Sequence, residues 1–245
     1  MELDPALYGE GIADIYDLVY PATPEVDHAV DFVQKRCRDN GTVLEFGIGT
    51  GRIALPLAER GVTVHGVDAS QRMLDRLAEK ITDQPVTASL GDFATVRCDG
   101  RFDVVLLAIN TFFMLPTQEL QIACLENARR HLAEDGKVII DVYEPTRFHS
   151  LDRTDTTIQH LDRESILLCS LQVDRVNQMA AIGQILMRSG EMHKTPEISR
   201  YAWPAEMDLM ARIAGLRLTE RWEDWQEHRF DHRSTRHVSV YEAQG

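Results

Sequence analysis

Residues 45–51, Glu45-Phe46-Gly47-Ile48-Gly49-Thr50-Gly51, decide the fold of this chain. They end an apolar run over residues 42–46 that predicts a strand, and they precede a helical pattern over residues 52–60. Glycines between a strand and a helix let the backbone turn tightly and bring its N–H groups close to a ligand. We therefore expect a ligand-binding turn at the end of a strand.

Strands and helices alternate outward from this turn, which predicts a parallel sheet. Strands are expected over residues 42–46, 62–67, 86–90, 102–109 and 137–142, and helices over residues 52–60, 71–80 and 118–132. Two closing strands, residues 216–222 and 237–241, follow a helix that Pro204 begins and Gly215 ends. The predicted fold class is α/β, a Rossmann-like and mostly parallel sheet of seven strands with helices on both faces.

Two segments depart from this alternation. Residues 5–37 show helical spacing in two pieces, separated at Pro21 and Pro24, and predict an N-terminal helical lid. Residues 165–173, 180–187 and 198–201 predict a small antiparallel insertion after the fifth strand. We expect one domain over residues 1–245, made of the lid (1–37), a cofactor-binding core (42–145), the insertion (150–202), and a last helix with closing strands (203–245).

Composition argues against several classes of partner. The formal net charge of −13 disfavours nucleic acid, because binding to phosphates needs clustered basic side chains. The longest aliphatic run, residues 104–109, is too short to span a bilayer, and the acidic N-terminus does not resemble a signal peptide. The four cysteines are far apart and indicate reduced thiols. We expect a cytoplasmic protein with a small-molecule substrate, with no nucleic-acid, membrane or metal partner, and with a homodimer left open.

Features at the ends of three successive strands favour S-adenosylmethionine over NAD as the ligand. A dinucleotide-binding turn would place its third glycine at position 52, where this chain has Arg52, and Glu45 lies two residues before the first glycine. Asp68 ends the second strand, where a carboxylate can accept hydrogen bonds from both ribose hydroxyls. Gly91-Asp92-Phe93 ends the third strand and brings a carboxylate and an aromatic ring to the adenine.

With these motifs the chain resembles the class I S-adenosylmethionine-dependent methyltransferases, strongly over residues 42–142 and loosely elsewhere. The resemblance implies that this cofactor, which leaves as S-adenosylhomocysteine, contacts Tyr16, Glu45, Gly47, Gly49, Gly51, Arg52, Asp68, Ala69, Met73, Gly91, Asp92, Phe93 and Ala108. The three glycines and Ala108 would surround the methionine moiety. Ser70 also resembles the family, but a helix cap is the alternative explanation for a serine there.

The segment Tyr8–Val19 resembles the lid of bacterial aminosugar N,N-dimethyltransferases and of lincosamide-type N-methyltransferases of natural-product biosynthesis. The resemblance implies that Tyr8 and Tyr16 bind the methionine carboxylate or cover the substrate, and packing among neighbouring isoleucines is the alternative. Nucleobase methyltransferases carry Asn/Asp-Pro-Pro-aromatic where this chain has Asn110-Thr111-Phe112-Phe113, which argues against a nucleobase acceptor. Phe113 also replaces a histidine of the aminosugar enzymes.

The acceptor is expected at the ends of the fourth and fifth strands, in contact with Asn110, Phe112, Phe113 and Tyr143. Methyl transfer from a sulfonium needs mainly alignment in a dry pocket. The candidate catalytic residues are Tyr8, Tyr16, Asp141 and His237: Asp141 could hold a cationic amine, and Asp141 or His237 could act as a base on a hydroxyl.

The most favoured function is N-methylation of an amine or of a secondary metabolite that bears an aminosugar, as in antibiotic biosynthesis. O- or C-methylation of a small natural product is one alternative, and a non-catalytic protein that binds S-adenosylmethionine is another, because fold does not determine function.

Overall fold

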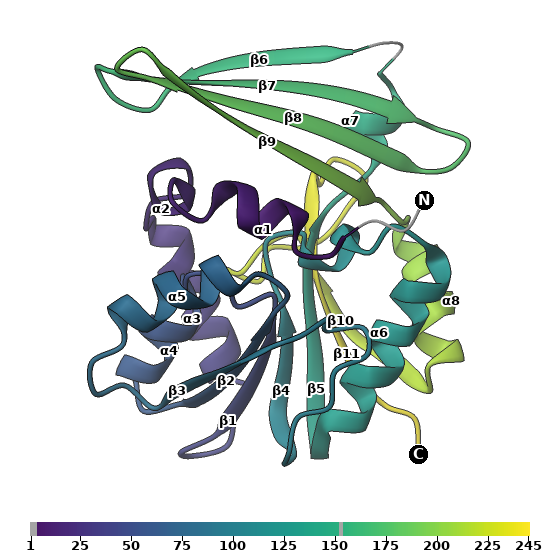
Figure 1. Ribbon diagram of the computed structural model, residues 1–245. Helices are drawn as coiled ribbons and strands as arrows, with labels where there is room; N and C mark the ends of the chain where they lie inside the picture. Colours follow the sequence, from purple (N-terminus) through teal and green to yellow (C-terminus); the bar gives the residue numbers. More distant parts are fainter. Residues whose placement is uncertain (1–3, 152–153) are drawn as a thin grey trace.

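A computed structural model describes residues 4–151 and 154–245 of the chain. Its larger sheet has seven strands in the order β10-β11-β5-β4-β1-β2-β3, which confirms the predicted α/β fold (Figure 1). The strands β1 (Thr42–Phe46), β2 (Thr63–Asp68), β3 (Val86–Leu90), β4 (Phe102–Leu107) and β5 (Leu132–Tyr143) pair in parallel. The strand β11 (Arg236–Ala243) runs antiparallel to β5 and to β10 (Leu216–Trp222).

Helices cover both faces of this sheet. One face packs against α3 (Pro24–Gln34), α4 (Ala54–Glu59) and α5 (Gln71–Lys80), and the other packs against α6 (Gln118–His131) and α8 (Pro204–Ile213) (Figure 1). Every residue of β4 is buried, and from Val104 to Leu107 its side chains alternate between the two apolar clusters. A continuous apolar run is expected for a parallel strand with a layer of helices on each side.

The observed boundaries of helices and strands agree closely with the sequence pattern where a residue such as a helix cap marks the boundary. Ser70 caps α5 by accepting a hydrogen bond from the Met73 N–H at 3.2 Å, so the capping explanation of this serine is confirmed. The strand β5 begins five residues before the predicted strand over residues 137–142, so residues 134–136 lie within it. Asp135 there has φ 62°, and the pairing register with β4 shifts, so these residues form a bulge.

The insertion forms a separate antiparallel sheet of four strands in the order β6-β7-β8-β9. It follows a short helix, α7 (Thr146–His149), and consists of β6 (Asp155–His160), β7 (Ser165–Asp174), β8 (Met179–Arg188) and β9 (Glu191–Arg200). The sequence pattern missed β6 and the first part of β9, because polar residues on both faces hide the alternation of a strand. Figure 1 shows this sheet lying across the carboxyl ends of the parallel strands.

The N-terminal segment forms three helices instead of the two predicted pieces: α1 (Leu7–Ile12), α2 (Tyr16–Val19) and α3. Helix α1 lies between the antiparallel sheet and the core (Figure 1). Its Gly11 carbonyl accepts a hydrogen bond from Thr195 of β9 at 3.3 Å, and its Glu10 carboxylate accepts one from Ser70 at 2.7 Å. Among the described residues, no helix is long and apolar enough to cross a membrane.

Candidate functional site

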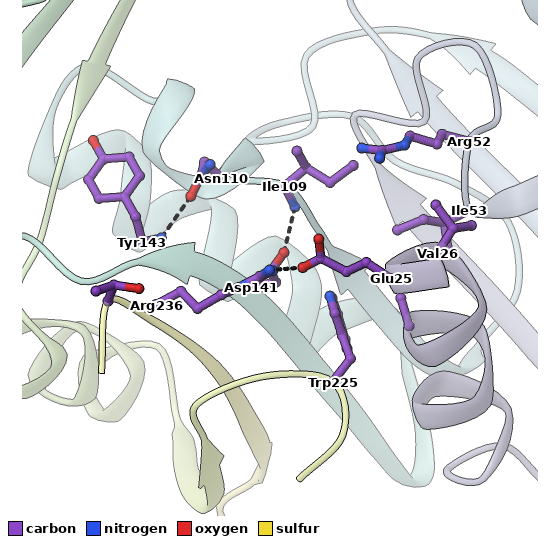
Figure 2. A pocket seen from close by; sticks show the side chains of 12 residues that line it. Glu25, Val26, Arg52, Ile53, Ile109, Asn110, Asp141, Tyr143, Trp225 and Arg236 are labelled. Atoms are coloured by element: carbon purple, nitrogen blue, oxygen red, sulfur yellow. Dashed lines mark hydrogen bonds and ion pairs between the residues drawn. The ribbon is translucent and has the colours of Figure 1, made fainter. Parts of the chain in front are cut away.

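Three neighbouring cavities lie at the carboxyl edge of the parallel strands. The central cavity, about 180 Å³, is lined by these residues predicted from the sequence: Tyr8, Tyr16, Glu45, Gly47, Gly49, Arg52, Asp68, Ala69, Met73, Phe93, Ala108 and Asn110. The β3-side cavity, about 550 Å³, shares Tyr8, Ala69 and Phe93 with it and adds Asp92. The β5-side cavity, about 290 Å³, shares Arg52 and Asn110 with it and adds Asp141 and Tyr143 (Figure 2).

The glycine turn forms the floor of the central cavity. Gly47 has φ 73°, and a Cβ there would lie 2.6 Å from Thr111 Cγ2. Both the backbone conformation and the lack of space therefore require glycine at this position. The Gly49 N–H donates to Asp68 Oδ2 at 2.8 Å, which ties the turn to the end of β2. Gly51 differs from the prediction: a Cβ there would meet Leu77 of α5 at 2.5 Å, and Gly51 lines none of the three cavities. With φ 83°, Gly51 serves the turn itself and its packing against α5.

Glu45 presents an unsatisfied carboxylate to the central cavity. Its side chain is buried, and among the described residues Oε2 has no hydrogen-bond partner. Burial and the neighbouring Asp68 charge raise the pKa of Glu45 to about 8, although the hydrogen bond from the Ala54 N–H lowers it. A buried carboxylate without a partner is costly unless a ligand supplies a donor or a cation. This atom therefore suits the ammonium group of a bound ligand.

Arg52 supplies the opposite charge at the same cavity. One guanidinium nitrogen donates to the Pro21 carbonyl at 3.1 Å, and Nε is buried without a partner among the described residues. An arginine with a free donor suits a carboxylate. Together, Glu45 and Arg52 match the ammonium and carboxylate of an amino-acid group, and Asp68 at the next strand end can accept hydrogen bonds from a ribose. The site thus fits the predicted S-adenosylmethionine.

Three tyrosines of the N-terminal segment form one wall of the central cavity: Tyr8, Tyr16 and Tyr20. The rings of Tyr16 and Tyr20 lie 5.0 Å apart, and the Tyr20 hydroxyl accepts a hydrogen bond from Gln184 of β8 at 3.1 Å. Burial raises the pKa of the Tyr8 and Tyr16 hydroxyls, so both stay protonated and can donate. The sequence interpretation missed Tyr20, although it continues the same helical segment.

The backbone is strained where β4 ends beside the cavities. Ile109 and Asn110 have φ angles of 53° and 63°, in the left-handed region that non-glycine residues rarely adopt. Such residues cost about 1–3 kcal/mol each and persist only where their surroundings hold them. Asp141 Oδ2 accepts from the Ile109 N–H at 3.0 Å, the Asp141 carbonyl accepts from Asn110 at 3.0 Å, and Asn110 Oδ1 accepts from the Tyr143 N–H at 2.7 Å (Figure 2).

Asp141 is also part of an ion-pair network in the β5-side cavity. Arg236 contacts Asp141 Oδ1 at 2.5 Å and also pairs with Glu25 of α3 (Figure 2). Burial raises the pKa of Asp141 to about 7, while the Ile109 N–H and the Arg52 charge oppose the rise. The Arg236 contact favours the ionised form further. Because Asp141 already has a cation, the geometry does not support its predicted contact with a substrate amine and indicates a positioning role.

Several other predicted residues lie away from the cavities. His237 is fully buried on the face of β11 opposite Asp141, and burial together with Arg221 and Arg236 lowers its pKa to about 3. Its Nδ1 hydrogen-bonds Ser239 Oγ at 2.9 Å, so a role as a base on substrate has no geometric support. Phe112, Phe113 and Gly91 also line none of the three cavities; the phenylalanines lie in the core cluster, where Phe113 packs on Tyr143 with ring centroids 5.0 Å apart.

Comparisons with known proteins agree with this geometry. A family model described as a methyltransferase domain matches residues 43–136. The cypemycin N-terminal methyltransferase of a Streptomyces species is 35% identical over 218 residues, which cover 88% of this chain and 89% of that protein. The chain belongs to the S-adenosylmethionine-dependent methyltransferases.

Solved structures extend the comparison to the whole chain of this methyltransferase. The CcbJ methyltransferase from Streptomyces caelestis is 37% identical with a TM-score of 0.92, over 99% of this chain and 100% of that one. CalS10 of Micromonospora echinaspora, an amino pentose methyltransferase involved in calicheamicin biosynthesis, has a TM-score of 0.70 over 93% of this chain and 94% of its own. At 17% identity CalS10 supports the fold alone.

Proposed function

We propose that this methyltransferase holds S-adenosylmethionine across the central and β3-side cavities and N-methylates an amine of a small natural product. The observation that carries the cofactor assignment is the unpartnered Oε2 of Glu45 at the cavity wall, opposite in charge to Arg52. Glu45 would bind the methionine ammonium, Arg52 its carboxylate, and Asp68 the ribose hydroxyls. Asp92 and Phe93, which line the β3-side cavity, would contact the adenine.

An amine acceptor is favoured over a hydroxyl or a carbon acceptor for two reasons. The relative that is 35% identical is named as an N-terminal methyltransferase, and the N-terminus of a peptide carries an amine. In addition, the carboxylate of Glu197 lines the central cavity, and a carboxylate suits a cationic amine better than a neutral hydroxyl or carbon acceptor.

In this proposal the protein mainly aligns and desolvates the reactants. When bound, S-adenosylmethionine supplies an activated methyl group. The strained turn at Ile109 and Asn110, held by Asp141, gives the wall between the central and β5-side cavities one defined shape. The tyrosines of α1 and α2 exclude water from the central cavity. Alignment of the reactants in a dry site supplies much of the rate enhancement.

The cofactor assignment predicts a selective thermal shift. S-adenosylmethionine or S-adenosylhomocysteine at a hundredfold excess over Kd should stabilise the protein by about 2.7 kcal/mol, which raises Tm by about 5–10 °C for a chain of this length. NAD should give no shift. Differential scanning fluorimetry measures this, and Glu45→Gln should reduce the shift. Equal responses to NAD and to the sulfur compounds would contradict the assignment, and mass spectrometry of amines incubated with enzyme and cofactor tests methyl transfer itself.

The proposed lid predicts a separate effect of two hydroxyl groups. Tyr8→Phe and Tyr16→Phe keep the ring packing but remove a donor facing the central cavity, so each should lower turnover several-fold to about tenfold, equivalent to about 0.5–1.5 kcal/mol. Residues 5–20 should also exchange amide hydrogens more slowly when S-adenosylhomocysteine is bound. If both variants turn over normally and exchange does not change with ligand, these helices are packing elements only.

A further inference from the structure

The antiparallel sheet turns a polar face toward the central cavity. On β9, Thr195, Glu197 and Ser199 alternate to one side, and cross-strand pairing places Gln184 of β8 opposite Thr195 on that same side. Thr195, Ser199 and Gln184 are all buried. A sheet face covered by protein is normally apolar. Thr195 and Gln184 use their polar groups to hydrogen-bond the Gly11 carbonyl and the Tyr20 hydroxyl of the N-terminal segment, so Glu197 is the member of this face that meets the cavity.

Glu197 is the charged member of this face, and it lines the central cavity across from the glycine turn. Among the described residues it has no ion pair and no hydrogen bond. The titratable groups that face it are the hydroxyls of Tyr8, Tyr20 and Tyr143 and the thiol of Cys169, none of them a cation. Burial raises its pKa to about 7. This carboxylate therefore needs a partner that the protein does not supply.

Two unpartnered carboxylates thus meet at one cavity from different sheets. Glu45 lies at the end of β1, beside the glycine turn and Asp68, where the ammonium of the cofactor would bind. Glu197 lies on the covering sheet. A cofactor ammonium at Glu45 leaves Glu197 without a partner, so the ionised form of Glu197 suits a second cation at this site.

We infer that Glu197 binds the protonated acceptor amine and removes its proton before methyl transfer, an inference that rests on the proposed N-methylation. The acceptor ammonium donates an N–H to the Glu197 carboxylate, and the proton moves to a carboxylate oxygen. The freed nitrogen lone pair then forms a bond to the methyl carbon, the carbon–sulfur bond breaks, and its electron pair stays on sulfur. The methylated ammonium leaves with S-adenosylhomocysteine, and Glu197 returns its proton to solvent. A pKa near that of the medium suits this exchange.

The first test needs no substrate. Because the pKa of Glu197 is raised in the folded protein, the folded state binds more protons than the unfolded state between about pH 4.3 and 7, and stability falls as pH rises through that window. Glu197→Gln should remove this loss, so its Tm advantage over the wild-type protein should grow up to about pH 7 and stay constant above it. Glu191→Gln, at the exposed start of the same strand, should show no such advantage. A difference in Tm between Glu197→Gln and the wild-type protein that does not change with pH would contradict the inference that the Glu197 carboxylate lacks a partner.

The second test uses dimethylammonium chloride as the probe, with S-adenosylhomocysteine bound at about pH 8. Dimethylammonium should raise the Tm of the wild-type protein more than tetramethylammonium, which has no N–H donor, and this difference should disappear in Glu197→Gln. Calorimetry should show the same affinity for S-adenosylhomocysteine in Glu197→Gln as in the wild-type protein, whereas Glu45→Gln should lose affinity. Equal responses to both cations in the wild-type protein would overturn the inference. So would loss of cofactor affinity in Glu197→Gln, which would assign the carboxylate to the cofactor.

The kinetic test separates this inference from the proposed function. With any amine that mass spectrometry shows to be methylated, Glu197→Gln should lower kcat/KM at least about tenfold near pH 7 and recover at higher pH, where free amine accumulates. Glu197→Asp should show a smaller decrease in kcat/KM than Glu197→Gln. If methylation proceeds equally well in Glu197→Gln at every pH, the inference fails while N-methylation stands. If no amine is methylated, N-methylation fails, and the two tests above still decide whether Glu197 is a cation site.

Discussion

Replacing Asp141 with alanine is expected to lower the free energy of unfolding by about 3–5 kcal/mol, because two hydrogen bonds to a buried carboxylate are lost and each contributes about 1.5–3 kcal/mol. Asp141 pairs with Arg236 and also fixes the strained Ile109, so the substitution removes both contacts at once. Urea denaturation measures the change. Asp141→Asn keeps an acceptor for the Ile109 N–H and should show a smaller decrease in the free energy of unfolding.

A matched control for this experiment is Asp83→Ala, because Asp83 is exposed in a loop. Its stability should stay within about 0.5 kcal/mol of the wild-type value. Turnover should fall in Asp141→Ala beyond the loss of folded protein, since the turn at Asn110 borders both the central and β5-side cavities. A stable Asp141→Ala protein with normal turnover would show that neither the ion pair nor the strained turn matters.

Replacing Asp68 with alanine should weaken S-adenosylhomocysteine binding by about 3 kcal/mol, roughly a hundredfold in Kd, because two hydrogen bonds to a charged acceptor are lost. The substitution also frees the N–H groups of Gly49 and Ser70, which Asp68 holds at 2.8 and 2.9 Å. Isothermal titration calorimetry measures the affinity. Asp75→Ala, on the exposed side of α5, is the matched control and should bind normally. An unchanged Kd in Asp68→Ala would remove the ribose assignment.

The turn proposed to bind the cofactor could be predicted from the sequence because local rules specify its geometry. A strand that ends in glycines needs positive φ angles and a close approach of the backbone, and both occur at Gly47. The acidic residue that ends β2 falls beside this turn because neighbouring parallel strands end at the same edge. Gly51 shows the limit of this reasoning, because the same motif also contains a glycine whose positive φ and close contact with Leu77 serve the turn and its packing on α5 instead of a cavity wall.

The acceptor half could not be predicted, because its residues come from distant elements without a motif. Glu197 lies in a strand whose first part shows no apolar alternation, and only pairing with β8 brings it over the cavity. His237 was a reasonable candidate by composition, yet the two-residue period of β11 places it on the opposite face from Asp141. Phe112 lies two residues after Asn110 in sequence but is buried in the core.

The covering sheet has one more consequence, for how such enzymes diverge. Residues 155–200 form a continuous stretch of sequence between β5 and α8, whereas the glycine turn, Asp68 and Asp92 all precede it. Replacing this single stretch, or a few inward positions along β9, would exchange the surface proposed to meet the acceptor and keep the glycine turn, Asp68 and Asp92 in place. Transplanting the hairpins between related enzymes is therefore a direct route to hybrids with new acceptor preferences.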